Sequence, residues 1–175
     1  MLGGVEPLLV AIARSDADGV DLIQIREKDL STRALCDLVT RAVALCRHAK
    51  VIVNARVDVA LACGAYGVHL PSDSPAPSAF RRITPPEFLI GVSCHDIAEL
   101  RTAACEGADY ALFAPVFRPL SKTDRRTPHG LDGLRAACHS VRLPIYALGG
   151  ITAENASDCV QAGAAGVAGI TLFQK

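Results

Sequence analysis

One short pattern recurs along the chain: a glycine ends a stretch of helical periodicity, and a short run of apolar residues follows. Glycine at a helix end accepts the left-handed conformation through which a chain turns back towards a strand. The pattern occurs at four places, Asp18-Gly19-Val20-Asp21, Cys63–Val68, Glu106–Ala111 and Ala162–Val167. Its repetition predicts a chain that is built from successive helix–strand units.

Seven apolar runs are candidate strands, and most are continuously apolar rather than alternating, which is typical of strands covered on both faces. They are Leu22–Arg26, Val51–Asn54, Gly67–Leu70, Leu89–Ser93, Tyr110–Ala114, Ile145–Leu148 and Gly166–Ile170. Helical periodicity is found over Ser31–His48, Asp96–Glu106 and Thr152–Ala162, with Ser31 as an N-cap. Strands that alternate with helices predict parallel α/β structure.

A TIM (β/α)8-type barrel is the architecture we expect, with an open doubly wound sheet as the alternative. No Gly-x-Gly-x-x-Gly follows the first strand, which favours the barrel. Seven strands are visible instead of eight, and the helix-like stretch Val5–Ala13 has no strand before it. We therefore expect a single domain over residues 1–175 that lacks the first strand of the barrel. The strand edges left unpaired would favour a homo-oligomer.

Charge and composition argue against several classes of partner. Lys plus Arg and Asp plus Glu both number 18, and aromatic residues make up only 5% of the chain. We therefore expect no nucleic-acid or membrane partner, and a cytoplasmic location without a secretion signal. The seven cysteines form no CxxC pair, which predicts free, mostly buried thiols rather than disulfides or a zinc site.

The active site of such a barrel lies on the loops that follow the strands. After the first strand, alternation places Gln24, Arg26 and Lys28 on one side of the chain. Arginine offers a planar fork to a phosphate group and lysine a point charge, so the three side chains predict an anion site. The alternative is a solvated loop whose charges pair through Glu27.

Polar residues also end the next three strands. Asn54 would either bind a ligand or cap the helix after it, and Asp58 reads as a charge in the first turn of that helix. His69 lies within its strand, so a hydrogen-bonded core histidine and a ligand contact are equal alternatives. Ser93 favours a hydrogen bond to substrate, and His95 is expected beside the cap of the next helix.

Two later connections suit a phosphorylated ligand. The longest loop, Pro115–Gly130, carries several cations and the pair Ser121-Lys122, which favours a lid over the site; the alternative is a surface loop without a role. Gly149 and Gly150 precede a helix expected near Thr152, and backbone amides there would cradle a phosphate. The alternative is a turn that packing alone requires.

The order and spacing of these motifs resemble the thiamine phosphate synthase/TenI family over nearly the whole chain. The motifs are Gln24–Lys28, Asn54–Asp58, Gly67–Leu70, Gly91–His95, Gly107–Tyr110, Ser121-Lys122, Leu148–Ile151 and Gly163–Thr171. The resemblance implies a (β/α)8 barrel whose first strand precedes the start of this chain. It also implies a place in thiamine biosynthesis and a small phosphorylated heterocycle as the ligand.

The synthase branch of the family joins a hydroxymethylpyrimidine diphosphate to a thiazole phosphate and releases pyrophosphate. The resemblance assigns pyrophosphate to Gln24, Arg26, Lys28 and Lys122, with Asn54 and Ser93 beside them. It assigns the thiazole phosphate to Gly150, Ile170 and Thr171, and Ser121 and Gly149 are further candidates for substrate or phosphate binding. The catalytic candidates are Lys122, Ser93 and His69.

Two departures from the family pattern concern magnesium and the long loop. The family's magnesium carboxylates would fall at Ala55 and Ser74, and Asp73 would compensate only partly. We therefore expect weakened magnesium binding and assign no residue to a metal. The loop reads Pro119-Leu120-Ser121-Lys122, which loses one hydroxyl of the family motif.

With these departures the chain resembles the TenI-like branch of the family. Members of that branch isomerise a thiazole phosphate carboxylate by moving a proton. The main expectation is therefore an enzyme of the thiazole tautomerase type, with His69, His95 and His129 as the available bases, since the usual histidine position is Pro115. The alternatives are a thiamine-phosphate diphosphorylase, which is a transferase, and a non-catalytic binder. Outside the family, a phosphosugar isomerase or a lyase with Lys28 as Schiff base remains.

Overall fold

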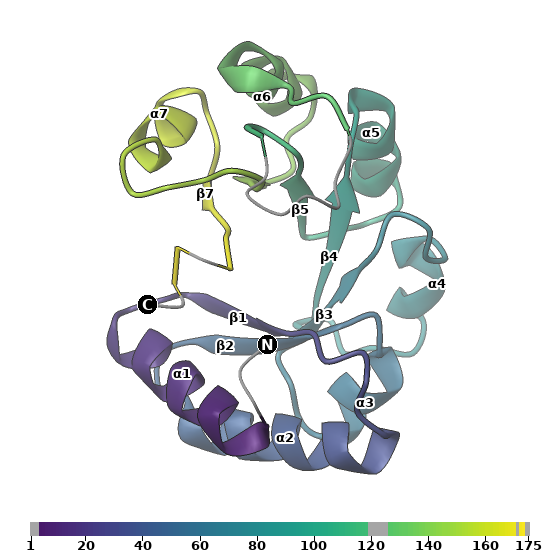
Figure 1. Cartoon of the computed structure of the whole chain (residues 1–175). Helices are drawn as coiled ribbons and strands as arrows, with labels where there is room; N and C mark the ends of the chain where they lie inside the picture. The colour runs from purple at the N-terminus through teal and green to yellow at the C-terminus, as the bar shows by residue number, and fades with distance from the viewer. Residues whose placement is uncertain (1–3, 119–125, 171, 174–175) are drawn as a thin grey trace. The chain divides into compact units, whose positions relative to one another are not determined.

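The computed structural model describes residues 4–118, 126–170 and 172–173, over which seven helices alternate with seven strands (Figure 1). In chain order they are α1 (Val5–Ala17), β1 (Leu22–Ile25), α2 (Thr32–Leu45), β2 (Lys50–Asn54), α3 (Val57–Ala62), β3 (Gly67–Leu70), α4 (Pro77–Arg81), β4 (Leu89–Cys94), α5 (Ile97–Cys105), β5 (Tyr110–Phe113), α6 (Gly130–Ser140), β6 (Ile145–Ala147), α7 (Ala156–Gln161) and β7 (Gly166–Val167).

The first of two compact units comprises residues 4–69 and 83–89. In it β1, β2 and β3 pair in parallel and in chain order, with Ile23 opposite Val51 and Val53 opposite Val68. Helices α1, α2 and α3 lie along one side of β1 and β2 (Figure 1). Asp16 at the end of α1 accepts three backbone N–H bonds from residues 47–49, which fixes the approach to β2.

The second unit comprises residues 70–82 and the described residues from 90 onwards, and its strands β4, β5, β6 and β7 also pair in parallel and in order. Its apolar core includes Leu100, Phe113 and Leu134, each at most 1% exposed. Asp109 joins α4 to this unit, since it accepts from the backbone N–H of Ile90 at 2.6 Å and pairs with Arg81.

The parallel pairing and the buried, continuously apolar strands confirm the predicted α/β class of the TIM (β/α)8 type, with seven strands among the described residues. Ser31 caps α2 through its hydroxyl, as predicted, and Asp96 caps α5. The single domain, the unpaired strand edges and the homo-oligomer stay predictions. Within the described ranges, no helix combines the length and apolarity needed to cross a bilayer.

Several predicted element bounds are wrong by one to four residues, and three of the differences bear on the candidate site. Strand β1 ends at Ile25, so Arg26 lies just outside it. Helix α7 begins at Ala156, four residues after Thr152. Strand β7 covers only Gly166–Val167 instead of extending to Ile170.

All seven cysteines are free, but they are not mostly buried as predicted. Only Cys94 and Cys159 are buried, Cys105 is exposed and the other four are half-buried. The half-buried thiols lie where helices meet each other or the ends of strands. For example, the thiol of Cys63 at the end of α3 lies 3.6 Å from the carbonyl oxygen of Cys36 in α2.

Candidate functional site

The carboxyl ends of β1 and β2 bring two predicted ligand residues together. Gln24 Nε2 donates to Asn54 Oδ1 at 3.1 Å, and both side chains are half-buried. Asn54 does not cap α3, because the N-cap position is Arg56. The side-chain oxygen of Gln24 can still accept a hydrogen bond, and the side-chain NH2 group of Asn54 can still donate one. The pair therefore has both an acceptor and a donor to offer a ligand.

The two predicted cations, Arg26 and Lys28, follow β1 as exposed side chains, and Glu27 between them is half-buried. Their exposure alternates as the sequence predicted. In the part of the chain that the structure describes, Glu27 forms no ion pair with either neighbour. The anion site at this loop stays a prediction.

The chain leaves β2 through a turn with unusual backbone geometry. Ala55 has φ 61°, and the N–H of Arg56 donates to the carbonyl of Asn54 at 2.7 Å, which closes a γ-turn around Ala55. A positive φ is uncommon for residues other than glycine, and for alanine it costs about 1–2 kcal/mol. Such a conformation persists only where surrounding contacts hold it.

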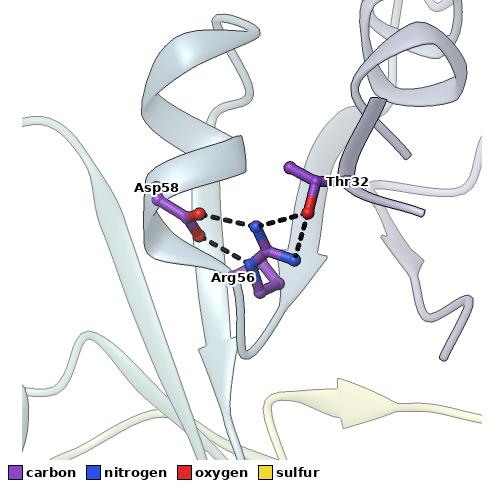
Figure 2. Close-up of polar contacts among 3 residues, drawn as sticks. All are labelled: Thr32, Arg56 and Asp58. Carbon is purple, nitrogen blue, oxygen red and sulfur yellow. Dashed lines mark hydrogen bonds and ion pairs between the residues drawn. The ribbon is translucent and has the colours of Figure 1, made fainter. Parts of the chain in front are cut away.

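The guanidinium group of Arg56 links the turn to Asp58 in α3 and to Thr32 at the start of α2 (Figure 2). Arg56 Nε and Nη2 donate to the two carboxylate oxygens of Asp58 at 2.8 and 2.6 Å. The same guanidinium donates to Thr32 Oγ1 at 3.3 and 3.4 Å. This hydrogen bonding with Arg56 lowers the pKa of Asp58, which lies in the first turn of α3 as predicted.

His69 in β3 is 2% exposed, and burial lowers its pKa to about 4. The imidazole is therefore neutral at physiological pH. Its backbone carbonyl accepts from the N–H of Ala55 at 2.8 Å, so β3 also supports the turn after β2.

In the second unit, Ser93 is a half-buried residue of β4, one position before the strand ends at Cys94. His95 precedes the N-cap Asp96 as predicted, and its Nδ1–H donates to the carbonyl of Ala114 at 2.8 Å. The His129 ring, in turn, stacks on Phe113 with centroids 4.5 Å apart. Two of the three histidines proposed as bases are thus engaged in contacts that fix their rings.

The turn after β6 is closely packed, as the alternative interpretation of its glycines predicted, and the phosphate cradle stays a prediction. A Cβ atom on Gly150 would lie 2.5 Å from the carbonyl oxygen of Arg118 and 2.8 Å from Phe117 Cβ, and the Gly150 φ is 64°. The N–H groups of Gly149, Gly150 and Ile151 have no acceptor among the described residues. Amides in such a turn suit an anion.

Asn155, which the sequence analysis did not single out, organises this turn. Its Nδ2 donates to the Gly150 carbonyl at 3.0 Å, and its Oδ1 accepts from the N–H of Thr152 at 2.9 Å. The carboxamide therefore spans the glycine turn and delays the start of α7. Ile170 lies beyond β7 and is exposed, while Ser121, Lys122 and Thr171 lie outside the described residues.

The two positions at which the resemblance places magnesium carboxylates do not fit the ion. Ala55 has only a methyl side chain, and Ser74 offers a hydroxyl group in place of carboxylate oxygens, which are the ligands magnesium prefers. Within residues 4–118, 126–170 and 172–173, no three His, Cys, Asp or Glu side chains gather as metal ligands would.

Sequence reasoning found Gln24 and Asn54 separately, and the structure brings them into contact. It overlooked Arg56 and Thr32, although the Arg-x-Asp spacing of Arg56 and Asp58 at the start of a helix was a readable signal. It also overlooked Asn155. Asparagine is common in loops and turns, so its place after the glycine turn did not by itself indicate this role.

Comparisons with known proteins point to one family. The family model described as thiamine monophosphate synthase matches residues 5–173. The thiamine-phosphate synthase of Methanoculleus marisnigri is 46% identical over 160 residues, which cover 89% of this chain and 74% of the relative. That of Moorella thermoacetica is 42% identical over 173 residues, which cover 97% and 82%.

A solved structure is similar as well. The thiamine phosphate pyrophosphorylase from Pyrococcus furiosus superimposes with a TM-score of 0.85 at 32% identity, over 95% of this chain and 81% of that one. Identity above 30% over most of both chains and a family match over nearly all residues lead to one conclusion. The chain belongs to the thiamine monophosphate synthase family.

Proposed function

We propose that the chain is a thiamine-phosphate synthase, a transferase that joins a pyrimidine diphosphate to a thiazole phosphate and releases pyrophosphate. The observation that carries the proposal is its 42–46% identity to chains named thiamine-phosphate synthase, over about nine tenths of its length or more. The carboxamide pair and the two cations at the ends of β1 and β2 support it.

The chemistry needs charge stabilisation more than proton transfer. The bond between the pyrimidine methylene carbon and the diphosphate oxygen breaks, and pyrophosphate leaves with the electron pair. The thiazole nitrogen then forms the new carbon–nitrogen bond with its lone pair and becomes cationic, and no proton moves. A preorganised set of donors around the leaving group is what accelerates such a step.

The residues of the first unit suit the leaving group. Arg26 and Lys28 would neutralise the pyrophosphate charge, and the donors of Gln24 and Asn54 would orient its oxygens. Lys122 and Ser93 keep the roles that the resemblance gives them beside the pyrophosphate, and Ser121 stays a further candidate.

Residues of the second unit suit the other phosphate. The N–H groups of Gly149 and Gly150, which have no acceptor among the described residues, would hold the thiazole phosphate together with Ile170 and Thr171. A Cβ atom on Gly150 would meet Phe117 and the carbonyl oxygen of Arg118, so the tight turn that carries these N–H groups requires glycine there.

The tautomerase function that we expected from the sequence is not supported by the relatives, whose names fit the synthase alternative better. Of the candidate bases, His69 is buried and its pKa is lowered to about 4. The Nδ1–H of His95 donates to a carbonyl group, which leaves Nε2 as the basic nitrogen, and His129 stacks on Phe113.

Magnesium has no step in this proposal, because the donors at Ala55 and Ser74 do not fit it. In this proposal Arg26 and Lys28 of the first unit would carry the charge of the leaving group instead. A Schiff-base lyase is disfavoured, because Lys28 is exposed and lacks the desolvation that activates such lysines.

A turnover assay tests the proposal. The purified chain is mixed with the pyrimidine diphosphate and the thiazole phosphate across a magnesium series, and pyrophosphate and thiamine phosphate are quantified. Equimolar formation of both products is the expected result. Binding of both substrates without product at enzyme concentrations near those of the substrates would contradict the proposal and favour the non-catalytic binder.

A further inference from the structure

We propose that Arg56 is a positioning residue that fastens the cation-bearing loop after β1 to the turn after β2. The proposal rests on the function proposed above, because that function gives the loop its ligand. All of its contacts lie within the first unit. They join the end of β1 and the start of α2 to the turn that follows β2, over sequence separations of 30 and 24 residues.

The loop is held at both ends by the same turn. Before the loop, Gln24 donates to Asn54 at 3.1 Å. After the loop, Thr32, the first residue of α2, accepts two N–H bonds from Arg56 (Figure 2). The segment 25–31 carries Arg26 and Lys28. It is therefore tied at its two ends to Asn54 and Arg56, the residues on either side of Ala55.

The turn itself requires support. Ala55 has a positive φ, and both of its flanking groups are used: its N–H donates to His69 and the Arg56 N–H closes back on Asn54. A strained residue keeps its conformation only when neighbouring contacts over-determine it. The guanidinium of Arg56 supplies such a contact one residue after the strain.

Arg56 is not itself suited to bind phosphate. Two of its donors are committed to the Asp58 carboxylate at 2.6 and 2.8 Å, which neutralises its charge. Its side chain is 38% exposed, so the pair is neither buried nor free in solvent. The planar fork reaches the carboxylate and the hydroxyl together, which a lysine ammonium on its flexible stem does not reproduce.

The consequence concerns affinity for the leaving group. If the fastening is cut, the cations of the loop sample more positions and must be ordered when the diphosphate binds. Affinity for inorganic pyrophosphate should therefore fall about threefold to tenfold, which is less than the loss of a direct charge-assisted hydrogen bond to the ligand would cause, because Arg56 acts only through the loop.

Thr32 offers a matched pair of variants. Thr32→Val keeps the shape of the side chain and removes the acceptor, whereas Thr32→Ser keeps the hydroxyl. Both leave the Arg56–Asp58 pair intact. Hydrogen exchange of the amides in residues 26–31, thermal unfolding, and calorimetric titration with inorganic pyrophosphate are measured on the full chain, with Arg56→Lys as a third variant.

We expect faster exchange in residues 26–31 and weaker pyrophosphate binding for Thr32→Val and Arg56→Lys, with a melting temperature close to that of the unmodified chain for Thr32→Val. Thr32→Ser should behave like the unmodified chain in all three measurements. A merely structural contact would change the melting temperature without a specific loss of pyrophosphate affinity.

Two results would overturn the role of Arg56 alone: unchanged exchange in Thr32→Val, or faster exchange with unchanged pyrophosphate affinity. A different result, no pyrophosphate binding by the unmodified chain, would overturn the proposed function and with it this role. The two failures are therefore distinguishable.

Discussion

Replacing Gly150 by alanine tests the idea that the turn after β6 needs a close backbone approach. The added Cβ would lie 2.5 Å from the Arg118 carbonyl oxygen and 2.8 Å from Phe117 Cβ. Phe117 has little freedom to retreat, because its N–H donates to the carbonyl of Gly149 at 2.9 Å. Gly150→Ala therefore combines a steric conflict with an unfavourable φ of 64°.

Gly107→Ala is the matched control. Gly107 has a similar φ of 81°, yet a Cβ there would meet nothing within 4 Å. The left-handed conformation costs alanine about 1–2 kcal/mol, and restriction of the unfolded chain returns roughly 0.4–1 kcal/mol. The control should lose about 1 kcal/mol or less. Overpacking adds about 1–3 kcal/mol at Gly150.

The expected difference is measurable by thermal unfolding. For a chain of this size, 1 kcal/mol corresponds to roughly 2–4 °C in melting temperature, so Gly150→Ala should melt several degrees below Gly107→Ala. Binding of inorganic phosphate should weaken in Gly150→Ala and stay unchanged in the control. Equal melting temperatures for the two variants would refute the close approach at Gly150.

Three further predictions concern charged and strained residues. Burial lowers the pKa of His69 to about 4, whereas a histidine in the unfolded chain has a pKa of about 6.5. As the pH falls below about 6.5, the unfolded chain therefore takes up a proton before the folded chain does. The resulting contribution to the free energy of unfolding, about 3 kcal/mol, is fully present above pH 6.5 and is lost towards pH 4. Urea unfolding of the unmodified chain at pH 7 and pH 4.5 should reveal this loss, and His69→Gln should show a smaller one. Ala55→Asp places a carboxylate at a left-handed position, and aspartate tolerates that conformation. Pyrophosphate binding should then depend on magnesium, whereas in the control Ala55→Asn it should not. Identical magnesium titrations of the two variants would contradict this. Backbone N–H bonds from Ala49, Arg47 and His48 lower the pKa of Asp16, so its contribution to stability is present above the normal carboxyl pKa and is lost in acid. Asp16→Asn should therefore have a lower melting temperature than the unmodified chain at pH 7. Its melting temperature should also change less between pH 7 and pH 3.

The strands could be predicted because burial on both faces leaves a continuous apolar run. β3 is buried at all four positions and was placed with its correct bounds. The helix caps Ser31 and Asp96 could also be read locally, because each accepts from an N–H three residues ahead.

Helix α7 illustrates why some bounds were missed. The stretch from Thr152 continues the helical periodicity, but the carboxamide of Asn155 takes the N–H of Thr152 and donates to the carbonyl of Gly150. Asparagine side chains compete with the helical backbone in this way. The outcome depends on the geometry of the preceding glycine turn, which periodicity does not report.

The site was predicted residue by residue but not contact by contact. Gln24 and Asn54 were both expected at strand ends. The parallel register places Gln24 opposite Ile52, two residues before Asn54, so the two side chains leave the sheet on the same face and can reach each other. The role of Arg56 depends on Thr32, 24 positions earlier, and on the strained turn at Ala55. Neither is visible in local spacing.

The most direct test of the central claim is calorimetric titration of inorganic pyrophosphate into the unmodified chain and two arginine variants. Arg26→Ala removes a proposed ligand, and Arg33→Ala removes an exposed arginine of α2 as the control. We predict that Arg26→Ala weakens binding by at least about tenfold, as expected for a charge-assisted hydrogen bond, and that Arg33→Ala changes it by less than about twofold. Equal affinity for all three proteins would contradict the assignment of the loop after β1 to the diphosphate.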